Sequence, residues 1–220
     1  AAIGSDSAPI RTNLAATATL TARAANDIHI VEQDSLNLET IYSQTGTIAL
    51  QALEGSIVDA LNHDFTNLKA NRIELIAELG IGEAGNPLDM DLVGAGTIYA
   101  LGNDDIVLSE TSGNMNIDRI ESTHGDAKLR AQVGIVSRTK NVAVEASSQF
   151  SGGNSLADVV AHSIDLTADF ATIGAPGRDI KIDTKGGNLT VASAENTHIL
   201  ETSDDLSIYT VSTGEAFTAF

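Results

Sequence analysis

Residues 81–92 read IGEAGNPLDMDL, and two sequence patterns meet in this stretch. It opens with an Ile-Gly pair followed by a proline, and it continues with apolar side chains at the alternate positions Leu88, Met90 and Leu92. Alternation with a period of two is typical of a β-strand that buries one face. Both patterns recur along the chain, and their recurrence predicts the fold.

The Ile-Gly pair occurs three times, and the three prolines of the chain each follow one copy. The first two copies are 78 residues apart (81 − 3) and the last two are 92 residues apart (173 − 81). The pairs and their prolines are Ile3-Gly4 with Pro9, Ile81-Gly82 with Pro87, and Ile173-Gly174 with Pro176. Self-similarity of this kind indicates a repeat architecture. We therefore expect one continuous domain, residues 1–220, with repeat units at 3–80, 81–172 and a truncated 173–220.

The repeat units are composed of short alternating runs separated by clusters of Gly, Asn, Asp, Ser and Thr, which predicts strands joined by turns. Comparable runs return about every 20 residues, the length of one coil of a solenoid. The dipeptides Asn-Gly and Asp-Gly, which favour tight hairpins, are absent. We predict an all-β, right-handed parallel β-helix with about four coils per unit and about eleven in all, forming a rod on the order of 50 Å long. The stretch 65–76 could form a short helix, but we interpret it as strand and loop.

Composition supports this fold and excludes several functions. The 220 residues are 42% hydrophobic but only 4% aromatic, with no Trp and no Cys, so the core must be aliphatic and cannot depend on disulfides. The formal charge of −18 argues against partners such as nucleic acid or anionic lipid. No run approaches a membrane-spanning length, and no secretory signal is visible in the sequence given.

The succession of motifs in the second unit resembles the repeats of giant filamentous-haemagglutinin-like bacterial adhesins. The residues that carry the resemblance are 81–92, the strand-like run 105–111, the run 114–118 and the run 125–131. The resemblance covers nearly the whole chain, although such repeats are recognised by their cadence and not by invariant residues. It implies a β-helical shaft, secretion to the bacterial cell surface, and a role in cell adhesion or biofilm formation. The partner it implies is a surface receptor or a glycan.

The candidate binding residues lie in an insertion of the second unit. Its stretch from Val136 to His162 is longer than the matching stretch of the first unit by about 13 residues, and the surplus is best placed near 147–155, a polar and turn-rich stretch. Insertions in solenoids often carry binding, so we expect contacts from Gln149, Phe150 and Asn154.

No residue pattern predicts catalysis or a cofactor, and the chain is not expected to be an enzyme. The five histidines show no metal-binding spacing, and His29 should point outward between Ile28 and Ile30. The pairs Asp104-Asp105 and Asp204-Asp205 could bind calcium but more simply form turns.

Two alternative functions remain open. One is a polysaccharide lyase or hydrolase, whose shallow site would lie among Asp118, Arg119, Lys128 and Arg130. The other is a subunit of a self-assembling extracellular filament, joined end to end through exposed coils.

Overall fold

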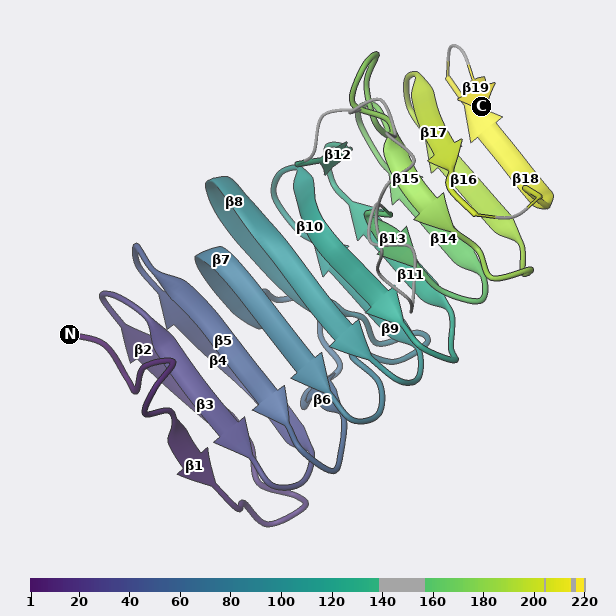
Figure 1. Ribbon diagram of the computed structural model, residues 1–220. Coiled ribbons are helices and arrows are strands. Elements are labelled where there is room, and N and C mark those ends of the chain that lie inside the picture. The colour runs from purple at the N-terminus through teal and green to yellow at the C-terminus, as the bar shows by residue number, and fades with distance from the viewer. Residues whose placement is uncertain (139–156, 204, 215–216, 220) are drawn as a thin grey trace.

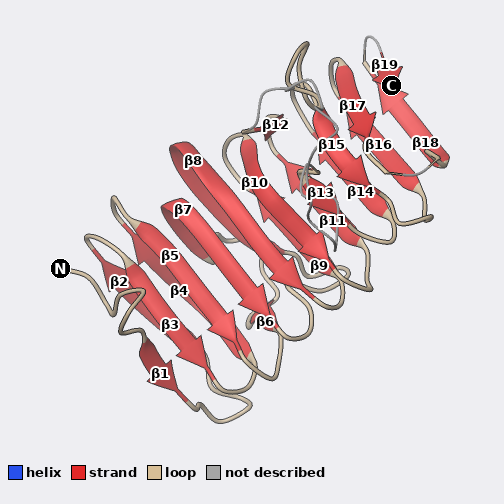
Figure 2. Cartoon of the chain, in the orientation of Figure 1, coloured by secondary structure: helices blue, strands red, loops and turns tan. Residues whose placement is uncertain are grey.

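The computed structural model describes residues 1–138, 157–203, 205–214 and 217–219, and within them every regular element is a β-strand. All named strand pairs are parallel, and the strands stack into a solenoid of about 9 turns (Figure 1). Coloured by secondary structure, the described residues form strands and loops alone (Figure 2). The predicted parallel β-helix is therefore confirmed. None of the described residues form a helix that could cross a membrane.

The strands, in chain order, are β1 Ile10–Thr12, β2 Leu20–Ala24, β3 Ile28–Glu32, β4 Leu36–Ser43, β5 Thr47–Ala52, β6 Ile57–Asp59, β7 Leu68–Ala77, β8 Leu88–Gly102, β9 Ile106–Glu110, β10 Met115–Ser122, β11 Ala127–Ala131, β12 Ile135–Ser137, β13 Val159–Val160, β14 Ile164–Ala168, β15 Ile180–Asp183, β16 Leu189–Ser193, β17 Thr197–Glu201, β18 Ile208–Thr213 and β19 Phe217–Ala219. The stretch 65–76 contributes to β7 and contains no helix, as the sequence analysis predicts. Its β-branched and aliphatic side chains suit a half-buried strand.

The strands form two parallel ladders, which the chain visits in alternation. The first ladder runs β1, β3, β5, β7, β8, β10, β13, β15, β17 and β19. The second runs β2, β4, β7, β8, β9, β11, β14, β16 and β18. The short strands β6 and β12 pair with the first residues of β4 and β10. The long strands β7 and β8 contribute to both ladders, with a register shift between Ala70 and Arg72. One turn of the solenoid is therefore one passage through each ladder.

The sequence repeat spans three and a half turns and not a whole number of them. In the first ladder, Ile3 stacks in register with Ile28, Ile48, Ile73 and then Ile98. Its repeat equivalent, residue 81, comes between the last two in sequence and pairs in the second ladder, with Ile57 and Ile106. The third copy, residue 173, pairs with Ile135 and Thr197, beside the first ladder. Equivalent residues of successive repeat units thus lie on opposite sides of the solenoid.

Each Ile-Gly pair starts the same compact loop. At Gly4, Gly82 and Gly174 the backbone φ is +68°, a conformation that favours glycine. A Cβ atom on Gly82 would lie 2.1 Å from the carbonyl oxygen of Val107 on the adjacent coil, so close approach of the two backbones also requires glycine. The loop after Gly82 inserts five extra residues relative to the adjacent coil. Ile81 and Leu88 are seven residues apart, whereas their partners Ile106 and Leu108 are two residues apart.

The interior is a continuous aliphatic column. In most of the central strands alternate residues are buried, as in β11, where Ala127, Leu129 and Ala131 point inward and the residues between them are exposed. Stacked aliphatic side chains repeat from coil to coil, for example Leu108, Leu129 and Leu166. Removal of this apolar area from water is the main force that holds the coils together.

Two sequence predictions require correction. The solenoid has about 9 turns and not eleven, because coils that contain loops use more than 20 residues, such as the 25 between Ile48 and Ile73 and the 37 between Ala127 and Ile164. At the usual strand spacing the rod is about 40 Å long. His29 does lie on the outer face, but its side chain is almost buried, because the loop after Gly4 folds over it and places Asp6 Oδ1 3.0 Å from its Nδ1.

Candidate functional site

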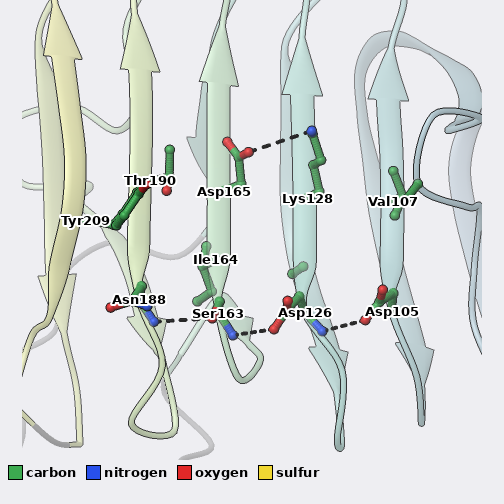
Figure 3. Close-up of a pocket in the computed structure, with 12 residues that line it drawn as sticks. Asp105, Val107, Asp126, Lys128, Ser163, Ile164, Asp165, Asn188, Thr190 and Tyr209 are labelled. Atoms are coloured by element: carbon green, nitrogen blue, oxygen red, sulfur yellow. Dashed lines mark hydrogen bonds and ion pairs between the residues drawn. The ribbon is translucent and has the colours of Figure 1, made fainter.

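A shallow groove of about 400 Å³ lies on the outer face of the second ladder (Figure 3). Outward side chains of β9, β11, β14 and β16 form its floor, and Tyr209 of β18 stands at one end. These side chains belong to residues that alternate with the buried ones. Because they lie on successive coils, the groove runs across the strands, along the axis of the rod. It can contact an extended ligand over several coils.

A row of polar side chains at the strand starts ties each coil to the next. The backbone N–H of Asp126 donates to Asp105 Oδ1 at 2.9 Å, and the N–H of Ser163 donates to Asp126 Oδ1 at 2.9 Å. The N–H of Asn188 continues the row by donating to Ser163 Oγ at 3.3 Å (Figure 3). Asp105 of the Asp104-Asp105 pair thus accepts a hydrogen bond from the adjacent coil through its carboxylate.

The second row of the groove combines opposite charges with one aromatic ring. Lys128 Nζ lies 3.9 Å from Asp165 Oδ2 on the next coil, and burial raises the pKa of Asp165 while Lys128 opposes that shift. Tyr209 is 77% exposed. It is the extra residue at a register shift between β16 and β18, where Leu189 pairs with Ile208 but Thr190 pairs with Thr210. The shift turns this ring onto the outer face beside Thr190.

A second recess of about 490 Å³ adjoins the first and shares Val107 and Lys128 with it. Its walls include Pro87 from the Ile-Gly loop and the ion pair between Arg130 and Asp169, with a 3.0 Å separation between Nη2 and Oδ2. The first unit carries the equivalent recess beside its own Ile-Gly loop, on the opposite ladder. That recess is lined by Pro9, Arg11 and His29 among others.

The structure does not bring together the four residues of the predicted polysaccharide site. Asp118 and Arg119 lie on β10, whereas Lys128 and Arg130 lie on β11, which belongs to the other ladder. Asp118 accepts a 2.8 Å bond from Arg72 Nη1. All four residues engage in ion pairs, which the outward alternation of neighbouring coils explains.

A glutamate recurs at one corner of each unit, buried in the first two units and half-buried in the third, and the sequence patterns did not identify it. Glu110 ends β9 and accepts hydrogen bonds from the N–H groups of Leu92, Ser112 and Gly113. Burial raises its pKa to about 7 although these N–H groups oppose the shift. Glu32 and Glu201 hold the equivalent positions at the ends of β3 and β17. The sequence could have revealed this position, because Glu32 and Glu110 are separated by 78 residues, as are the first two Ile-Gly pairs.

The predicted binding residues Gln149, Phe150 and Asn154 lie outside the described residues, as does Asp204. Within residues 1–138, 157–203, 205–214 and 217–219, no group of three or more His, Cys, Asp or Glu side chains could hold a metal ion.

No protein-family model, no curated protein and no solved structure matches this chain. Its fold and surface are therefore the basis for any proposal about its function.

Proposed function

We propose that this chain is a shaft segment of a secreted bacterial surface adhesin, a stiff spacer that carries contact surfaces away from the cell. The observation that supports the proposal is the uninterrupted ladder of parallel strands over an aliphatic column through about 9 turns. Each coil bonds only its neighbours, so the rod can be lengthened by further repeats without a new core. The resemblance of residues 81–131 to adhesin repeats points in the same direction.

The outer surface supports a structural role more than a catalytic one. The charged side chains of the groove pair with one another across coils, as in Lys128 with Asp165 and Arg130 with Asp169. Glu110, the carboxylate whose pKa is strongly raised, is 1% exposed and accepts hydrogen bonds from three backbone N–H groups. Such a group stabilises a turn and cannot easily reach a substrate.

The spacer role can be tested by placing the chain between a cell-surface anchor and a binding domain of known ligand. The distance between anchor and domain is then measured by fluorescence energy transfer. A rod of about 9 turns should hold a single distance with a narrow distribution. A Gly/Ser linker of equal residue number, which behaves as a random coil, serves as the control. A distribution as broad as that of the linker would refute the spacer.

The adhesive role needs a separate assay. Beads coated with the chain are washed over bacterial and epithelial cell layers, and retained beads are counted against beads coated with albumin. Retention above the albumin control supports adhesion, and equal retention counts against it. Incubation with acidic polysaccharides gives the enzymatic alternative its own readout, because new reducing ends would indicate cleavage.

A further inference from the structure

We draw no further inference here: the strongest candidate, the groove over β9, β11, β14 and β16 with Tyr209 at one end, belongs to the site already described, and nothing in the structure shows which ligand would occupy it.

Discussion

At the scale of single residues, the three Ile-Gly loops depend on a backbone conformation and on a close approach, and the two effects can be separated. Gly82 and Gly85 both have a positive φ, +68° and +83°. A Cβ on Gly82 would clash with the adjacent coil, whereas a Cβ on Gly85 would meet nothing within 4 Å. The comparison of these two positions therefore isolates the contact between coils.

Gly82→Ala should destabilise the chain more than Gly85→Ala does. The left-handed conformation alone costs roughly 1–2 kcal/mol for a residue other than glycine, and both variants carry that cost. The clash with the Val107 carbonyl adds to it only at Gly82. The measurement is the urea midpoint of each variant. Equal midpoints would show that the coils can separate locally at no cost.

The buried glutamate corner predicts a pH dependence of stability. The folded-state pKa of Glu110 is raised to about 7 from 4.5, so the folded chain holds this proton over a range in which the unfolded chain has lost it. The stability that Glu110 contributes is complete below pH 4.5, falls as the pH rises, and levels off above pH 7. The free energy of unfolding below pH 4.5 should therefore exceed that above pH 7 by about 3 kcal/mol through this group.

Glu110→Gln should remove that fall. We expect the free energy of unfolding of the parent chain to decrease relative to the variant between pH 4.5 and 7, measured by urea denaturation at several pH values. Glu83→Gln, in an exposed loop, is the control for the loss of one negative charge. Parallel pH profiles for the parent chain and Glu110→Gln would show that Glu110 is not the responsible group.

At the scale of the strand, alternation predicts which side chains are inside, and β14 offers a matched pair. Leu166 is fully buried, whereas its neighbour Thr167 lies on the outer face opposite Arg130. Leu166→Asp would bury an unpaired carboxylate and should cost several kcal/mol, enough to shift or abolish cooperative unfolding. Thr167→Asp should change the thermal midpoint little. Similar losses in both variants would contradict the assigned faces.

Alternation alone did not predict burial on the outer face. His29 and Val107 both occupy outward positions, yet they are 8% and 6% exposed. The loops that follow Gly4 and Gly82 fold over them, and no period-two pattern contains that information. The hydrogen bond from Asn67 Nδ2 to Asp59 Oδ1 was not predicted either, because alternation identifies buried apolar side chains and does not pair polar ones.

At the scale of the whole molecule, the solenoid should respond locally to damage in its core. Leu129→Ala removes a fully buried side chain from β11 and should cost 2–5 kcal/mol by analogy with other core truncations. Because each coil contacts only its neighbours, amide hydrogen exchange should accelerate in β9, β11 and β14 and remain near that of the parent chain in β3 and β5. Uniform acceleration through the rod would indicate a single cooperative unit.

The class of fold was predictable from the sequence because short alternating runs, repeated units and an aliphatic composition all point to a parallel solenoid. The turn count was wrong because a coil is not a fixed number of residues: it takes 20 between Ile28 and Ile48, 25 between Ile48 and Ile73 and 37 between Ala127 and Ile164. Because the number of residues per coil varies, the sequence did not predict which ladder each charged residue occupies. Asp118 and Lys128 were therefore assigned to one site, although they lie on different ladders.

The spacing of three and a half turns between equivalent residues gives the rod an approximate twofold screw axis. Two consecutive units make seven complete turns, so the arrangement would come back into angular phase only after every second copy. A binding feature encoded once per unit would then alternate between opposite flanks, and neighbouring partners would not crowd one another. A longer array of such units would be multivalent in two directions, without a front or a back.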